Sequence, residues 1–204
     1  MLKKFASDAL GLSDIGKIIG PEDYDKTDAD DYVRHEDGEK IYFLIKTKAD
    51  EYCFTNLALI HVDGENAVSS KRTLKRYPYS QHKMSNVALE TAGKVDLDIE
   101  IKFHLGKEAY SIDVDKRELE KLNDLYKALV YISEETNENN VMLEMASQSL
   151  DKAVTVLQNS RTSDANLADQ YKLLTEYGFD WLKSVRKEYH KKDFGDVFEK
   201  YINN

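Results

Sequence analysis

The chain has 204 residues and a formal net charge of −9 at pH 7, a length that suits one to two domains. This acidic balance argues against binding to nucleic acid or to an anionic membrane surface, because both need clustered lysine and arginine. The single cysteine, Cys53, excludes an internal disulfide, and no apolar run reaches the roughly 18 residues of a membrane span. We therefore expect a soluble cytoplasmic protein.

The N-terminus is predicted to form a short helix that ends at Gly11. Its apolar positions fall at helical spacing and are Leu2, Phe5, Ala6, Ala9 and Leu10. Residues 11–17 also have the glycine and lysine spacing of a phosphate-binding P-loop. However, Ile18 stands where the magnesium-binding serine or threonine belongs, and a helical pattern precedes the stretch instead of a strand. We interpret these residues as a helix stop followed by a turn.

Six carboxylates crowd residues 22–31 and suggest a calcium loop. An EF-hand loop that began at Asp23 would place Asp28 where a glycine is needed and Arg34 where the closing glutamate belongs. That geometry fails, so we predict a solvated acidic linker. Together with the N-terminal helix, the linker makes up a first segment, residues 1–38.

A hydrophobic period of two indicates β-strands from residue 40 onward. The predicted strands cover residues 40–46, 52–54, 57–62, 70–79, 84–90, 95–105 and 110–114. In residues 95–105 every odd position is apolar and every even one polar, as in a strand with one buried face. Asp63-Gly64 is a hairpin dipeptide, and Pro78 marks a strand end or a sheet edge. About seven short strands joined by tight turns predict an antiparallel barrel or sandwich.

The period changes to that of a helix at Asp115, which has capping-box spacing to Glu118. One apolar stripe follows, formed by Leu119, Leu122, Tyr126, Leu129 and Val130. We expect this helix to plug an open end of the barrel. A polar break at residues 136–140 then separates it from a purely helical region.

Two apolar seams in that region predict an antiparallel helical hairpin. The first seam contains Leu143, Ala146, Leu150, Ala153 and Leu157; the second contains Leu167, Tyr171, Leu174, Gly178, Trp181 and Val185. Because a two-helix hairpin leaves apolar surface on its flanks, the barrel or another subunit has to cover it. The candidate interaction residues are Leu143, Leu150, Leu157, Leu174 and Trp181. A short apolar helix is expected after them, at residues 194–201.

Several strings in the β-rich region, in this order and spacing, resemble the bacterial pleckstrin-homology (PH) domain family. They are Phe54-Thr55-Asn56-Leu57, Tyr77-Pro78-Tyr79-Ser80 and Glu90-Thr91-Ala92-Gly93, the last running into Asp96-Leu97-Asp98. The resemblance covers about residues 40–133, and the hairpin matches the helical oligomerisation region of YvbH-type members. It implies a seven-strand PH-like barrel capped by a C-terminal helix, self-assembly that is often ring-shaped, and a poorly defined biochemical role. Ala58 departs from the pattern, which commonly has arginine there.

Candidate catalytic and metal-binding groups lack the spacing that such chemistry needs. Asp96, Asp98 and Glu100 form a row on a strand, where alternate residues lie about 6.6 Å apart, so a solvated face or a subunit contact explains them better than a metal does. Cys53 lies in an apolar run and is interpreted as a small buried hydrophobe. No histidines show a metal-binding spacing. An enzyme would need a deep pocket that unites Cys53 or a strand histidine, His61 or His104, with a carboxylate.

A basic cluster on one predicted strand suits an anionic partner and consists of Lys71, Arg72, Lys75 and Arg76. Its alternative is a charged edge strand that prevents pairing with other chains. The first hairpin turn, residues 46–51, offsets two lysines with two carboxylates and has no arginine to grip a phosphate. Lipid-headgroup binding therefore stays the alternative to a protein-interaction role.

We predict an α+β chain with a PH-like seven-strand antiparallel barrel and capping helix at residues 39–136 and a helical hairpin extension at 137–204. The expected function is a non-enzymatic protein-interaction and self-assembly module without a cofactor or metal. Its partners are expected to be other copies of the chain and possible unidentified proteins, not nucleic acid. Lipid binding is the first alternative and a cryptic enzyme the second.

Overall fold

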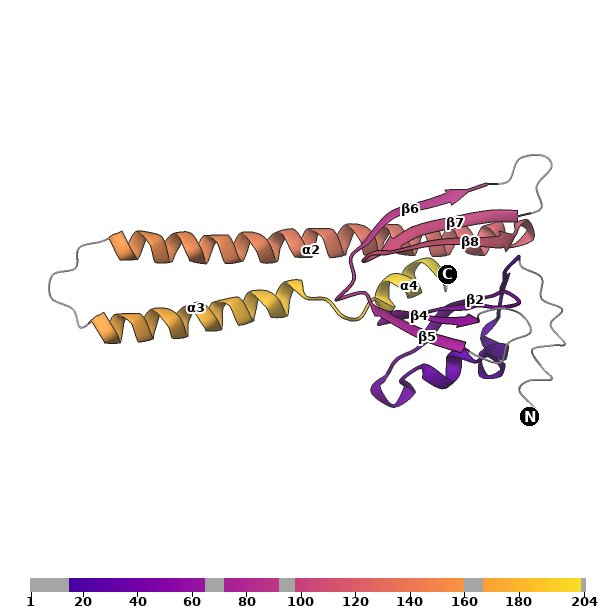
Figure 1. Ribbon diagram of the computed structural model, residues 1–204, viewed down its shortest axis with the longest axis horizontal. Coiled ribbons are helices and arrows are strands. Elements are labelled where there is room, and N and C mark those ends of the chain that lie inside the picture. The colour runs from indigo at the N-terminus through magenta and orange to yellow at the C-terminus, as the bar shows by residue number, and fades with distance from the viewer. Residues whose placement is uncertain (1–14, 65–71, 92–97, 160–166, 203–204) are drawn as a thin grey trace. The chain divides into compact units, whose positions relative to one another are not determined.

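The computed structural model describes residues 15–64, 72–91, 98–159 and 167–202 (Figure 1). The predicted N-terminal helix and most of the P-loop-like stretch lie outside the described residues. The chain divides into two compact units. The first unit comprises Met1–Glu134 and Lys192–Asn204, and the second comprises Glu135–Lys191.

The strands of the first unit form two antiparallel sheets with the orders β1-β2-β3-β4-β5 and β6-β7-β8. They are β1 (Lys17–Ile18), β2 (Ile41–Lys46), β3 (Glu51–Thr55), β4 (Ala58–Gly64), β5 (Arg72–Pro78), β6 (Met84–Glu90), β7 (Asp98–Leu105) and β8 (Glu108–Asp115). The seven strands from β2 to β8 are those predicted from the alternating pattern. In β7 the odd positions are buried and the even ones are not, as the period of two requires.

Gly16 links the two sheets at one side. It forms a parallel bridge to Val114 of β8, and its backbone N–H donates to the carbonyl oxygen of Asp113 over 2.7 Å. A Cβ atom at Gly16 would lie 2.7 Å from Cγ2 of Ile45 and 2.9 Å from that same carbonyl oxygen. Only glycine allows this approach. Gly16, the second glycine of the P-loop-like stretch, therefore lies in a bridge between the sheets and not in the predicted turn.

The Asp63-Gly64 dipeptide is not a two-residue turn. Both residues lie within β4, where they pair with Thr73 and Arg72 of β5, so the prediction of a tight hairpin at this point is wrong. The connection between the two strands is instead residues 65–71, which lie outside the described part of the chain. The expectation for Pro78 is confirmed, since it ends β5 at the edge of the five-stranded sheet.

The acidic segment is structured, unlike the solvated linker that its composition predicted. It forms three short 3₁₀ helices: η1 (Pro21–Lys26), η2 (Ala29–Tyr32) and η3 (His35–Asp37). Ala29 and Val33 are buried in a small core with residues of β2, β3 and β4. Glu51 fastens the segment, because its carboxylate accepts a hydrogen bond from the Ala29 N–H over 2.7 Å and also pairs with buried Lys46. The acidic segment therefore packs its few apolar side chains against one side of the sheet.

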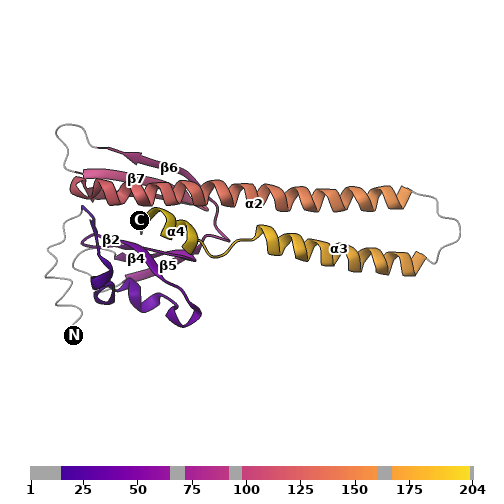
Figure 2. The same ribbon diagram turned by 180° about the vertical axis from the view of Figure 1, so that it is seen from behind.

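The main core lies between the two sheets and contains residues of both sheets and of two helices. The first part of α2 (Leu119–Asn159) contributes Leu122, Leu125, Ala128, Leu129 and Ile132. It is preceded by η4 (Lys116–Glu118), capped by the side chain of Asp115. The C-terminal helix α4 (Gly195–Ile202) also lies between the sheets in both views (Figures 1 and 2). The sequence groups this helix with the hairpin, whereas in the structure its buried side chains complete the first unit.

The second unit is a hairpin of the remainder of α2 and α3 (Leu167–Tyr189) (Figure 2). Helix α2 continues through residues 136–140, so the predicted break is wrong. These residues include neither glycine nor proline, and asparagine in a helix costs less than about 0.7 kcal/mol relative to alanine. The two helices approach closely at Gly178, where an added Cβ atom would lie 3.3 Å from the side chain of Leu150.

Candidate interaction surface

The hairpin exposes large apolar side chains. Among the side chains that the structure describes, those with more than a third of their surface exposed are Val141, Met145 and Val156 of α2 and Tyr171, Leu173, Tyr177 and Phe179 of α3. Leu173 and Tyr177 are 67% and 70% exposed and stand one helical turn apart, on one side of α3. Val141 and Met145 have the same spacing on α2. The described part of the first unit exposes far fewer such side chains: Tyr32, Leu74 and Tyr131.

Most of the large seam residues are less exposed than these side chains, although Tyr171 of the second seam is 71% exposed. Leu143, Leu150, Leu174 and Trp181 are half-buried within the second unit, and the Leu150–Gly178 approach places the seam inside the hairpin. Residue 157 belongs to α2, but its side chain lies outside the described part. The exposed pairs occupy positions outside the predicted seams, so a pattern of one apolar stripe per helix does not identify them. The sequence signal for the exposed pairs is that each helix contains more apolar residues than one seam accounts for.

The basic cluster on β5 is neutralised by carboxylates. Arg72 lies 3.8 Å from Asp28, and Lys75 donates to Asp63 over 2.7 Å. Arg76 donates to the fully buried carboxylate of Glu39 over 2.9 Å. Lys71 lies outside the described residues. These ion pairs and the edge position of β5 favour the charged edge strand over a surface that binds anions.

The acidic row of β7 is part of a polar network on the outer face of the smaller sheet. Glu100 pairs with Lys102 over 2.8 Å and accepts a hydrogen bond from Ser111, and these contacts lower its pKa. Lys102 also pairs with Glu90 over 2.9 Å. Residue 96 lies outside the described part. Glu100 is therefore paired with a cation and a hydroxyl group on this face of the sheet.

Cys53 is fully buried and has no features of a nucleophile. Burial, and then the carboxylates of Glu39 and Glu51, raise the pKa of its thiol well above the ordinary value. A protonated thiol is a poor nucleophile and a poor metal ligand. The interpretation of Cys53 as a small core residue therefore agrees with its environment.

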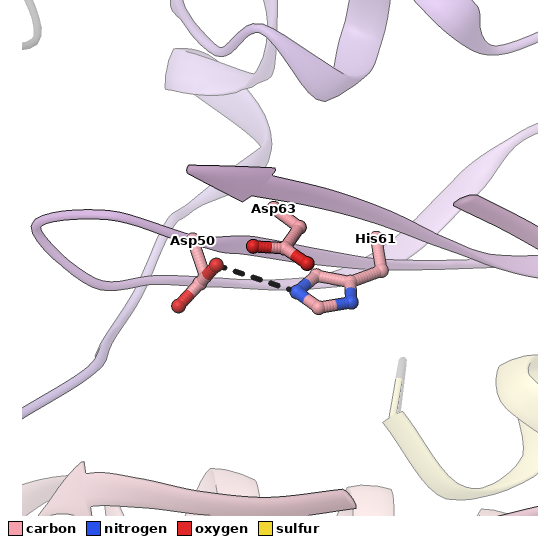
Figure 3. A group of neighbouring side chains, drawn as sticks. All are labelled: Asp50, His61 and Asp63. Atoms are coloured by element: carbon pink, nitrogen blue, oxygen red, sulfur yellow. Dashed lines mark ion pairs between the residues drawn. The ribbon is translucent and has the colours of Figure 1, made fainter. Parts of the chain in front are cut away.

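Within the described residues, one group of three side chains has the composition of a metal site: Asp50, His61 and Asp63 (Figure 3). One ligand atom from each lies within 4.8 Å of the others. Asp50 ends the turn before β3, where its N–H donates to the Thr47 hydroxyl over 2.8 Å. His61 and Asp63 lie two residues apart on β4 and so project from the same face of the sheet. Sequence spacing alone did not reveal this group, because its members come from a turn and a neighbouring strand.

In chain order, two antiparallel sheets are followed by a long helix and an apolar helical hairpin. This order of elements is that of a PH-like protein with a helical extension. None of the described helices combines the length and apolarity that crossing a membrane requires. The profile of the bacterial PH domain matches residues 9–133, and that of the YvbH-like oligomerisation region matches residues 144–204. The chain belongs to the bacterial PH domain family.

Two of the relatives match all or nearly all of this chain. It is 74% identical over its whole length to the uncharacterized protein YvbH of Bacillus subtilis (strain 168), all of which is covered. A crystal structure of a PH-domain-containing bacterial protein from Exiguobacterium sibiricum 255-15 has a TM-score of 0.83 and 56% identity. That match covers 93% of this chain and 100% of the other. A second Bacillus subtilis protein, the uncharacterized YjqA, is 31% identical over 97 residues, which are 47% of this chain and 76% of YjqA.

Proposed function

We propose that the protein is a non-enzymatic interaction module that self-assembles through its helical hairpin. The observation that carries this proposal is the set of exposed apolar side chains on α2 and α3 of the second unit. The match of residues 144–204 to an oligomerisation region supports the same assignment. The first unit already encloses a core with its own strands and helices, so we assign the assembly to the second unit.

The physical driving force is the burial of apolar surface. Exposed side chains such as Leu173 and Tyr177 lose contact with water when a second copy covers them. Full burial of one such side chain contributes about 1.5–3 kcal/mol. Removing one from an interface should therefore weaken association about ten- to a hundredfold. The half-buried seam residues already pack within the hairpin, so they gain less from a partner.

Sedimentation equilibrium of the purified full chain tests the proposal. The wild type should associate at tens of micromolar, and the double variant Leu173→Glu/Tyr177→Glu should become monomeric while its helical circular dichroism stays unchanged. The control is Leu74→Glu, which places one glutamate on a partly exposed leucine of the first unit and should leave association unaltered. A monomeric wild type, or equal effects of the two changes, would contradict the proposal.

The rival functions have less support. A lipid headgroup site needs accessible cations, whereas the described cations of β5 pair with Asp28, Asp63 and Glu39. An enzyme is not indicated either, since the relatives are PH-domain or uncharacterised proteins and the thiol of Cys53 is buried. No observation supports lipid binding or catalysis as directly as the exposed apolar pairs of the hairpin support self-assembly.

A further inference from the structure

We propose that Asp50, His61 and Asp63 bind a divalent transition-metal ion of the zinc class (Figure 3). The ladder between β3 and β4 pairs Tyr52 with His61, which brings the turn residue Asp50 beside the imidazole. Both carboxylates and the ring thus meet at one end of the sheet. This convergence depends on the first unit alone and is independent of self-assembly.

His61 supplies the strongest indication of a ligand. Its side chain is only 10% exposed, and neither ring nitrogen has a hydrogen-bond partner among the described residues. Tyr52 stacks on the ring with centroids 4.5 Å apart, and Tyr110 meets it edge to face. A buried polar group without a hydrogen bond costs about 1–3 kcal/mol, and an ion bound to Nε2 would remove this cost at one of the two nitrogens. The ring is held by its neighbours with Nε2 directed at the Asp50 carboxylate.

The separation of the ligand atoms suits a tetrahedral ion. Nε2 of His61 lies 3.4 Å from Oδ1 of Asp50, which is longer than an ordinary hydrogen bond. Bonds of about 2.1 Å from tetrahedral zinc place neighbouring ligand atoms about 3.4 Å apart. Asp63 is within 4.8 Å of both groups and can complete the set by a small side-chain movement. One imidazole with two carboxylates favours zinc, cobalt or nickel over calcium or magnesium, which prefer ligand sets made only of oxygen.

Two further contacts define the site. The N–H of Gly64 donates to Oδ1 of Asp50 over 3.3 Å and orients that carboxylate. Lys75 donates to Oδ2 of Asp63 over 2.7 Å, so an ion has to share this carboxylate with an ammonium group. Asp50 also lines a cavity of about 210 Å³ together with Asp113, so the site is open to solvent on the side of this carboxylate.

Isothermal titration of zinc chloride into the chelator-stripped full chain tests the proposal. We expect one saturable site per chain, weakened at least about tenfold by Asp50→Asn and by His61→Gln. The matched control is Asp113→Asn, which removes a carboxylate from the same cavity without touching the cluster and should bind as the wild type does. Circular dichroism and thermal unfolding verify that each variant is folded. If His61→Gln fails to fold, Asp50→Asn still tests the site, because Asp50 is partly exposed and its replacement should not prevent folding.

Lys75→Gln distinguishes a metal site from a fortuitous contact. Removing the competing ammonium group should tighten zinc binding several-fold, because Asp63 becomes free and one positive charge is lost. Cobalt chloride should give the visible absorption of a low-coordinate ion in the wild type and not in Asp50→Asn. Absence of saturable zinc binding, or equal binding by the wild type, Asp50→Asn and His61→Gln, would overturn the proposal.

Discussion

Glu39 is the residue on which the junction between η3 and the sheet depends. Its carboxylate is fully buried and accepts hydrogen bonds from the Thr55 hydroxyl, the Arg34 N–H and the Arg76 guanidinium over 2.5, 2.9 and 2.9 Å. Burial by itself would raise the pKa of Glu39, but the three hydrogen bonds and the Arg76 charge outweigh it, and the pKa is lowered. The ionised carboxylate is therefore the form that stabilises the fold.

Glu39→Gln should destabilise the protein by about 3 kcal/mol at pH 7, because it leaves the Arg76 charge without its partner. A lowered folded-state pKa gives stability that is present above the unfolded-state pKa and lost as the pH falls through the folded-state pKa. The difference between wild type and variant should thus shrink in acid, as measured by urea unfolding from pH 7 down to pH 3. Glu36→Gln, a change of an exposed carboxylate in η3, is the control and should have little effect. A pH-independent difference would contradict the role assigned to the charge.

At the scale of the element, α4 behaves as an internal part of the first unit. Phe198 is fully buried, stacks on Tyr42 with centroids 5.4 Å apart and tilts against Tyr79. Phe198→Ala should lower the free energy of unfolding by about 3–5 kcal/mol, because it leaves a cavity between the sheets. Lys200→Ala changes an exposed position of the same helix and should cost less than about 1 kcal/mol. Thermal unfolding followed by β-sheet circular dichroism makes the comparison, and similar losses would mean that α4 is not core.

The elements predicted from sequence are those with a long regular period. β7 alternates over its whole length, and the apolar stripe of α2 begins where the strand pattern ends, so both follow from local chemistry. β1 has two residues, too few to show a period. The 3₁₀ segment has few apolar positions, and the burial of Ala29 depends on a contact with Glu51 that is 22 residues distant. The place of α4 depends on contacts still further apart in sequence, such as the Tyr42–Glu199 hydrogen bond of 2.8 Å.

The two candidate sites also differ in how far the sequence predicts them. Apolar residues at helical spacing indicate amphipathic helices, so the sequence predicts the hairpin surface as a region but does not single out the exposed pair Leu173 and Tyr177. Which apolar face packs inside and which faces outward is decided by the partner helix, and a single helix pattern does not contain that information. The cluster of Asp50, His61 and Asp63 arises from strand register, which brings together residues that no sequence motif links.

At the scale of the whole molecule, the second unit is an insertion within the first. The first unit resumes at Lys192 and ends with α4, while Glu135 and Lys191, the terminal residues of the second unit, form an ion pair of 3.2 Å. The ends of the insertion are therefore close together. Such an arrangement predicts that the first unit keeps its core when the hairpin is removed, since its buried residues lie at positions up to 132 and from 194 onward.

Replacement of residues 136–190 by a glycine-serine linker of about six residues, which spans roughly 13 Å, should give a folded protein that no longer associates. It should retain β-sheet circular dichroism and cooperative unfolding, and sedimentation should give the mass of one chain at concentrations where the full chain assembles. The shortened chain should also bind zinc as the full chain does, because Asp50, His61 and Asp63 all belong to the first unit. If the shortened chain still self-associates, the assembly surface lies on the first unit, and the effects of Leu173→Glu/Tyr177→Glu have to be explained by changes within the hairpin itself.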